Sequence, residues 1–394
     1  MMRLYMNVSQ TTSTSSALDA FSPRALDSVY ANLACIDYQE TPLFELNGLA
    51  WHLGVSKILV KDEGQRSSLR SFKALGGAHA VVKLVIQEVG KRLGISLQPS
   101  DLMREDVQTV ARTLTLCCAT DGNHGRSVAA AARVVGCRSV IFIHEGVSES
   151  RGQAIADQGA EVIRVSGNYD DSVEHATRMA EENSWYVVSD TSWPGYEAIP
   201  TWVMQGYLVM ANEALNQARV LGKPITHVFL QAGVGGYAAA ITAYLVNALG
   251  EQVPRIIVVE PENAACLYES AIKGECTRIE AHSSTIMGML ECYEPSLVAW
   301  RILSEHAAAF MTISDEVGLR AMAIMAYPLS GDMVIRGGES GAAGLAGLQA
   351  VAGSGEARQS LGLDENSVVL VFNTEGATDE ALYESLLLKA KALI

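Results

Sequence analysis

The regular alternation of two kinds of segment constrains the fold of this chain most. From residue 57 onward, short runs of apolar and β-branched residues alternate with longer amphipathic segments. The expected strands cover 57–60, 113–119, 139–144, 161–165, 185–189, 227–231, 255–259 and 368–372. The expected helices cover 72–93, 124–135, 148–158, 169–183, 201–218, 237–249 and 341–351. Strands that alternate with helices form βαβ units, and continuously apolar strands are typical of parallel sheets covered on both faces. The sequence therefore predicts an α/β protein with open parallel sheets.

The charge of the chain limits its partners. Its 44 acidic and 29 basic residues give a net charge of −15, which repels phosphate backbones and anionic lipid. The N-terminus lacks the apolar core of a signal peptide, and no apolar run reaches the roughly 20 residues that span a bilayer. We therefore expect a cytoplasmic protein with no nucleic-acid and no membrane partner. The cysteines show no zinc-like spacing, so no metal site is expected, and Cys266 and Cys292 are interpreted as free thiols.

Lys73 is the first candidate for chemistry, because in open α/β sheets ligands bind beyond the carboxyl ends of the strands. It lies at the start of an expected helix, among the small and apolar residues of 71–78. Such surroundings desolvate an amine and favour its uncharged form, which can attack a carbonyl group. Taken alone, Lys73 is more simply a solvated lysine in the first turn of a helix.

A glycine-rich loop follows the expected strand 227–231. Its residues Gly233, Val234, Gly235 and Gly236 allow the backbone to approach an anion, and the helix that follows offers free N–H groups. The loop lacks the third glycine of a dinucleotide site and the lysine of a nucleotide-triphosphate site, so a simple phosphate fits better. A tight structural turn is the alternative interpretation.

Two further loops present polar residues after strands. Asp121 and Asn123 stand at the start of an expected helix, where either is also a typical N-cap, and Thr374 follows the last apolar strand. A lysine, a phosphate loop, an Asn-Gly helix start and a late hydroxyl together indicate one cofactor pocket.

In this order the four segments resemble the fold-type II (tryptophan-synthase β-like) enzymes that use pyridoxal 5'-phosphate (PLP), and in particular the diaminopropionate ammonia-lyase family. The resemblance runs from Thr41 to Gly376, and its carrying segments are 58–63, 72–78, 120–126, 200–207 and 338–342. It implies PLP as cofactor, bound in the cleft between two domains, and a homodimer. The large domain is expected to comprise 1–73 and 191–394, and the small domain 74–190.

The resemblance also implies roles for the singled-out residues. Lys73 would form the covalent bond to the cofactor, whose ring would lie near Asn123. Gly233 to Gly236 would hold the phosphate, and Thr374 would face the pyridine nitrogen. A hydroxyl at that place leaves the nitrogen largely unprotonated, which makes PLP a milder electron sink suited to β-elimination.

The residue type at position 121 indicates which class of substrate the enzyme uses. Hydroxyamino-acid dehydratases of this fold usually have Ser or Thr at its place, and a carboxylate there repels the carboxylate of a plain amino acid. A carboxylate at position 121 is favourable if the substrate carries a second ammonium group. Asp190 is a second candidate to supply negative charge near that group. We therefore expect α,β-elimination of D- or L-2,3-diaminopropionate to pyruvate and two ammonia, with Lys73 and Asp121 taking the Cα proton from opposite faces. A helix N-cap without a catalytic role is the alternative for Asp121.

Two rival functions stay open at this point. One is a serine or threonine dehydratase of the same fold, and the other is a catalytically silent binding protein on the same scaffold. A nicotinamide-dependent oxidoreductase is disfavoured by the glycine pattern. Nothing in the sequence assigns a role to Glu260 or Glu339.

Overall fold

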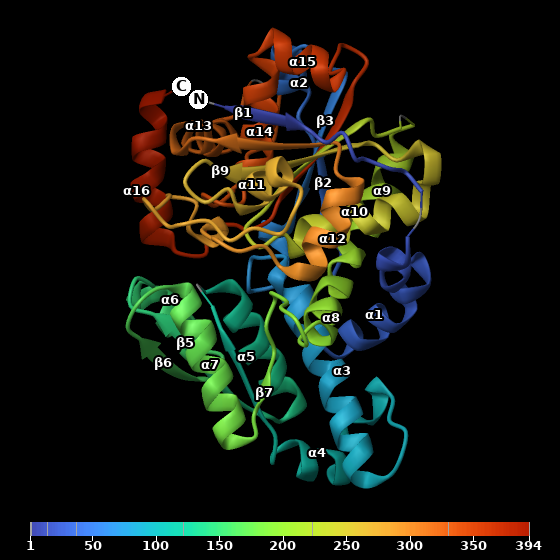
Figure 1. The fold of residues 1–394 in the computed structure, drawn as a ribbon, viewed down its shortest axis with the longest axis vertical. Coiled ribbons are helices and arrows are strands. Elements are labelled where there is room, and N and C mark those ends of the chain that lie inside the picture. The colour runs from blue at the N-terminus through green and yellow to red at the C-terminus, as the bar shows by residue number, and fades with distance from the viewer. Residues whose placement is uncertain are drawn as a thin grey trace. The chain divides into compact units, whose positions relative to one another are not determined.

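The structure, a computed structural model, divides into two compact units (Figure 1). It describes residues 2–13, 15–36, 38–120, 122–222, 224–329 and 331–393. The large unit comprises Met1–Pro23, Glu40–Phe72 and Met210–Ile394, and the small unit comprises Arg24–Gln39 and Lys73–Val209.

The large unit is built on a sheet of seven strands in the order β1-β10-β9-β8-β11-β3-β2. These strands are β1 (Arg3–Met6), β2 (Leu43–Glu45), β3 (Lys57–Asp62), β8 (His227–Gln231), β9 (Arg255–Pro261), β10 (Ala309–Ile313) and β11 (Val368–Asn373). The five inner strands are parallel, and only the edge strands β1 and β2 run antiparallel to their neighbours. Asn373 pairs with Asp62, and Val371 pairs with Phe229. The ends of β3, β8 and β11 therefore lie at the same edge of the sheet.

Helices cover both faces of this sheet. They are α2 (Asn47–Leu53), α9 (Leu208–Val220), α10 (Gly236–Leu249), α11 (Cys266–Lys273), α12 (Leu297–His306), α13 (Asp315–Ala326), α14 (Ala343–Ala352), α15 (Gly355–Leu361) and α16 (Glu380–Ala390). Phe229 belongs to a core shared with α13, α14 and α16, whereas α10 packs on β8 and on α12. Side chains alternate along a strand, so Val228 and Leu230 face away from the Phe229 core. Within the described residues, none of the helices has the length and apolar character to cross a membrane.

The small unit contains a parallel sheet of four strands in the order β6-β5-β4-β7. Its strands are β4 (Thr115–Ala119), β5 (Arg138–His144), β6 (Glu161–Val165) and β7 (Tyr186–Val187). Its helices are α1 (Leu26–Leu33), α3 (Lys73–Leu93), α4 (Glu105–Ala111), α5 (Asn123–Val135), α6 (Glu149–Ala156), α7 (Tyr169–Asn183) and α8 (Ala198–Gly206). Cys117 and Phe142 pack with Ala176 and Ala180 of α7 on one face of the sheet, and α5 contacts β4 and β5.

The predicted fold class is confirmed, since both sheets are parallel in their interiors and alternate with helices along the chain. Two predicted elements differ from the structure. The strand expected over 185–189 is reduced to Tyr186–Val187, and the helix expected over 201–218 is interrupted at Tyr207. The interruption lies where α8 meets α3: a Cβ atom on Gly206 would lie 2.6 Å from the carbonyl oxygen of Leu75.

The compact units also divide the chain differently from the expected domains. Residues 24–39, Lys73 and residues 191–209 fall in the small unit, although they were expected in the large domain. The reason is packing across sequence distance, because α1 and α8 both contact α3. The contact with α8 is close: a Cβ atom on Gly76 would meet ring carbons of Tyr207 at 2.4 and 2.6 Å.

Candidate active site

Lys73 and Asp190 form an ion pair in the small unit. Lys73 is the first residue of α3, and its Nζ donates a hydrogen bond to Oδ2 of Asp190, which follows β7. Their side chains are 21% and 12% exposed, so the pair is largely shielded from water. Burial by itself raises the pKa of the Asp190 carboxyl, but the Lys73 ammonium outweighs it and holds that pKa below its usual range. The structure thus brings together two residues that the sequence singled out separately.

His124 stands beside this pair as a neutral side chain. Its Nε2 lies 2.7 Å from the carbonyl oxygen of Val188 and therefore carries the hydrogen, because a carbonyl only accepts. Its Nδ1 lies 4.0 Å from Oδ2 of Asp190. Burial lowers the pKa of His124, although the Asp190 carboxylate opposes this. His124 thus fills the space next to Asp190 without donating to it.

Tyr207 completes the surroundings of Lys73 and was missed in the sequence. The residue is only 1% exposed, and the charges of Lys73 and Asp190 both act on its phenol. Burial raises the pKa of Tyr207 above its ordinary value, so the phenol keeps its hydrogen. The two glycines at the contact of α3 with α8, Gly76 and Gly206, were the signal that one helix lies unusually close to the other.

The start of α5 is organised by Thr120. Its Oγ1 accepts hydrogen bonds from the N–H groups of Gly122 (3.0 Å) and Gly125 (3.1 Å). Gly122 has φ +149°, a conformation that favours glycine, and Asn123 follows as the buried first residue of the helix. Asp121, the predicted second base, lies outside the described residues.

The glycine loop of the large unit has the features of an anion site. Gly235 has φ +93° and is the N-cap of α10, a helix of 14 residues. Because glycine has no side chain, this cap leaves the first-turn amides to an outside acceptor. A Cβ atom on Gly233 would lie 2.9 Å from Sγ of Cys292, and one on Gly235 would lie 3.0 Å from Leu267. The loop therefore needs glycines and fits the phosphate of the expected cofactor.

Two thiols border this loop. Sγ of Cys266 lies 3.7 Å from the carbonyl oxygen of Gly233, and Cys292 lies against the same glycine. Both thiols are buried, and burial raises the pKa of Cys266 well above its ordinary value. They contribute packing rather than charge to the loop.

Glu260 holds the helix that carries Cys266. It stands in β9, and its carboxyl oxygens accept from the N–H groups of Leu267 (2.8 Å) and Tyr268 (2.7 Å) in the first turn of α11. Complete burial raises its pKa from 4.5 to about 8, although the two amides favour the charged form. The structure thus gives a structural role to a residue that the sequence left without one.

The contribution of Glu260 to the stability of the protein should fall as the pH rises from 4.5 to 8, because the folded state keeps the Glu260 proton that the unfolded chain has lost. Glu260→Gln mimics the protonated carboxyl and should remove up to a few kcal/mol of that decline. Urea unfolding midpoints across this pH range measure it. The exposed Glu280→Gln is the control and should retain the decline. Parallel pH profiles for both variants would show that Glu260 does not titrate in this window.

Thr374 lies directly after β11, at the same sheet edge as the glycine loop. Its Oγ1 accepts a hydrogen bond of 2.9 Å from Nε2 of Gln231, the last residue of β8. Its carbonyl oxygen accepts from the N–H of Phe72 at 3.1 Å, and Gly376 N–H donates to Arg70 at 2.9 Å. Residues 70–72, which precede Lys73, are therefore hydrogen bonded to residues 374–376.

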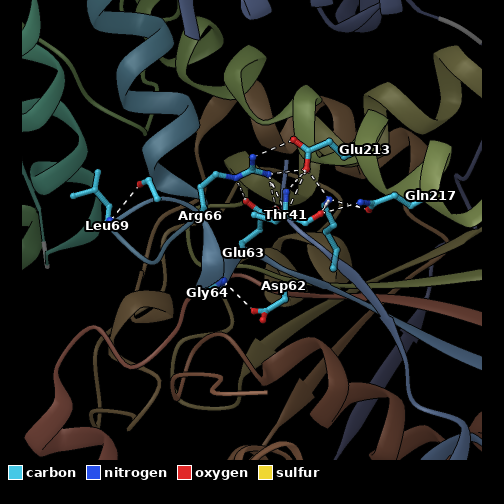
Figure 2. Close-up of polar contacts among 10 residues, drawn as sticks. Thr41, Asp62, Glu63, Gly64, Arg66, Leu69, Glu213 and Gln217 are labelled. Carbon is cyan, nitrogen blue, oxygen red and sulfur yellow. Dashed lines mark hydrogen bonds and ion pairs between the residues drawn. The ribbon is translucent and has the colours of Figure 1, made fainter. Parts of the chain in front are cut away.

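A buried charge network fixes the other side of the same segment (Figure 2). Arg66 contacts Oε2 of Glu63 at 2.8 Å through Nε, and Oε2 of Glu213 at 2.9 Å through Nη2. Lys61 contacts the same Glu213 oxygen at 2.6 Å, and Thr41 Oγ1 donates to Glu63 at 2.7 Å. None of the four charged side chains is more than 3% exposed, and the two cations balance the two carboxylates. The network therefore joins β3 and the loop after it to α9.

Arg66→Met should lower the free energy of unfolding by about 3–5 kcal/mol, because the carboxylates of Glu63 and Glu213 would remain buried with too little positive charge. Arg320→Met is the control. It removes an exposed ion pair with Glu316, one helical turn away, and should cost less than about 1 kcal/mol. Urea unfolding compares the two. Equal losses would contradict the importance of the buried network.

Each unit thus holds its own part of the predicted site. Lys73 and Asp190 meet in the small unit, which also contains Asn123. The glycine loop and Thr374 follow the neighbouring strands β8 and β11 of the large unit. Among the residues that the structure describes, no group of three or more His, Cys, Asp and Glu side chains is arranged to hold a metal ion.

This chain is similar in sequence to known proteins. A family model described as "Pyridoxal-phosphate dependent enzyme" matches residues 36–375. Diaminopropionate ammonia-lyase of Escherichia coli (strain K12) is 41% identical over 358 residues, which cover 90% of this chain and 88% of that protein.

Solved structures of diaminopropionate ammonia lyase from Escherichia coli are similar to this chain over nearly its full length. The crystal structure of the Escherichia coli diaminopropionate ammonia lyase in complex with D-serine has a TM-score of 0.90 at 37% identity, covering 100% of this chain and 99% of that one. Its complex with an aminoacrylate-PLP azomethine reaction intermediate has a TM-score of 0.89 at 38% identity, covering 99% and 98%.

Proposed function

The chain belongs to the pyridoxal-phosphate-dependent enzymes and, among them, to the diaminopropionate ammonia-lyases, and from this membership we propose that it eliminates ammonia from 2,3-diaminopropionate. The substrate and one water become pyruvate and two ammonia. The Lys73–Asp190 ion pair carries the proposal, because it places a lysine ammonium and an ionised carboxylate together in a shielded position.

The residues that would hold PLP are those predicted from the sequence. Lys73 would supply the amine for the covalent bond, and Asn123 would lie near the ring. The N–H groups of Gly233 to Gly236 and of the α10 start would receive the phosphate, and Thr374 would face the pyridine nitrogen. When bound, PLP withdraws electrons from the substrate's α-carbon. This eases cleavage of the Cα–H bond and of the bond between Cβ and the β-nitrogen. The uncapped start of α10 and the close contacts at Gly233 support the phosphate assignment.

Asp190 would select a second positive charge on the substrate. Its low pKa keeps it ionised, and a carboxylate in this shielded position needs a cation beside it. Lys73 supplies that cation in the structure. When the lysine amine is uncharged, the β-ammonium group of a diamino acid is a suitable replacement. A hydroxyamino acid has no such group, which favours the diamino acid over serine and threonine.

Two groups would remove the Cα proton, each from one face of the substrate. The free amine of Lys73 accepts it from one face of the substrate, and Asp121 accepts it from the opposite face, so that one site processes both enantiomers. The hydroxyl of Thr120 already bonds to the first-turn amide of Gly125. Because Thr120 already accepts from this amide, the helix does not need Asp121 as its cap. This supports a catalytic role for Asp121.

The function is tested by measuring pyruvate and ammonia from D- and L-2,3-diaminopropionate, with D-serine, L-serine and L-threonine alongside. We expect two ammonia per pyruvate from diaminopropionate, with kcat/KM well above the values for the hydroxyamino acids. Activity on serine or threonine alone would instead identify a dehydratase of the same fold. Binding of PLP without turnover of any of these amino acids would favour the catalytically silent protein.

Asp121→Asn should lower kcat by about 10² or more for one enantiomer of diaminopropionate and much less for the other, because general-base catalysis contributes on that scale. Steady-state kinetics on the separate enantiomers measure this. The matched control is Asp106→Asn, an exposed residue paired with Arg104, which should leave both enantiomers unaffected. Equal losses for the two enantiomers in Asp121→Asn would remove the two-base mechanism.

Three further features stay predictions. They are a homodimer, a cytoplasmic location and the lack of a nucleic-acid partner. The net charge of −15 supports the last of these.

A further inference from the structure

Gln231 has an unusual set of neighbours inside the large unit. The residue ends β8 and is only 1% exposed. Its Nε2 lies 3.0 Å from the carbonyl oxygens of Gly341 and Phe372 and 2.9 Å from Oγ1 of Thr374. A fourth oxygen, the carbonyl of Ser340, lies at 3.4 Å. One amide nitrogen is therefore surrounded by oxygen atoms.

These neighbours determine which end of the Gln231 amide points at Thr374. Carbonyl oxygens only accept hydrogen bonds, so the group that faces three of them must be the NH₂ group. The reversed amide would place Oε1 against those carbonyls without any hydrogen between them. In the structure Oε1 finds no hydrogen-bond partner among the described residues. A buried acceptor without a partner is costly, which shows that the donor end dominates the orientation.

The orientation of Gln231 fixes the role of the Thr374 hydroxyl. A hydroxyl has one hydrogen to donate, and here its oxygen already accepts from Gln231. The hydrogen of Thr374 is then left for another acceptor. We propose that Gln231 is a positioning residue that makes the Thr374 hydroxyl a hydrogen-bond donor to the pyridine nitrogen of PLP. The inference rests on the proposed function and implies that this nitrogen is unprotonated.

Gln231 also links the two cofactor-binding segments of the large unit. It stands two residues before Gly233, and its side chain crosses from β8 to the end of β11. A Cβ atom on Gly344 would lie 2.8 Å from its Oε1, so the start of α14 closes over the amide. A change at Gln231 therefore affects Thr374 first, and the hydroxyl becomes able to donate to the carbonyl oxygens that the amide no longer satisfies.

A double-mutant cycle on the PLP-reconstituted enzyme tests whether Gln231 acts through Thr374. Gln231→Met and Thr374→Val are compared singly and together, with the dissociation constant of PLP and kcat as readouts. Each single variant should weaken PLP binding on the order of tenfold, the worth of one hydrogen bond. The double variant should be no weaker than either single one, since both remove the same interaction. Gln349→Met, in α14 and outside the site, is the control and should leave the PLP dissociation constant unchanged.

Losses that multiply in the double variant would overturn the proposal, because Gln231 would then act independently of Thr374. The wild-type enzyme offers a second test that does not depend on the folding of a variant. After reconstitution with PLP labelled with ¹⁵N in the ring, the nitrogen resonance should be that of an unprotonated, hydrogen-bonded pyridine. A pyridinium resonance would contradict the proposal. Neither outcome is confused with failure of the proposed function, which would appear as absence of PLP binding or of elimination in the wild type.

Discussion

The large unit depends on mutual neutralisation of four buried charges. Glu63 and Glu213 cannot lose contact with Arg66 and Lys61 without leaving charge in a site closed to water, so the network favours the observed conformation of the loop after β3. Further along, the same loop is hydrogen bonded to the Thr374 segment at Arg70 and Phe72. The chain therefore reaches Lys73 from a segment held on both sides. Such support is what a site needs when a covalently bound cofactor must keep a defined orientation.

In the small unit, the partly shielded Lys73–Asp190 ion pair has a different purpose. The Lys73–Asp190 pair is stable while the lysine is protonated, but the proposed chemistry requires its amine to become uncharged. The carboxylate would then lack its partner, and under the proposed function the second ammonium group of the substrate would restore the balance. Substrate choice and cofactor attachment would in this way both follow from one charge requirement. Neutral His124 does not relieve it, because its Nδ1 offers Asp190 no hydrogen.

Much of the fold could be predicted from local pattern, and the residues proposed for the site came partly from the same source. The apolar strands, the glycine loop and Lys73 each stand out within a few residues of sequence. The roles of Gln231 and Tyr207 could not be predicted, because they depend on partners far along the chain: Gln231 meets Thr374 across the β8–β11 pairing, and Tyr207 reaches Lys73 through the α3–α8 contact. Helix α1 joins the small unit for the same reason. Asp121 remains a prediction from the sequence.

The most direct test of the account is to identify the lysine that carries the cofactor. The protein is reconstituted with PLP, reduced with borohydride to make the bond permanent, digested, and mapped by mass spectrometry. The account predicts a phosphopyridoxyl group on Lys73, with Lys61 and Lys83 unmodified. A modification on another lysine, or none on Lys73 in a protein that binds PLP, would contradict it.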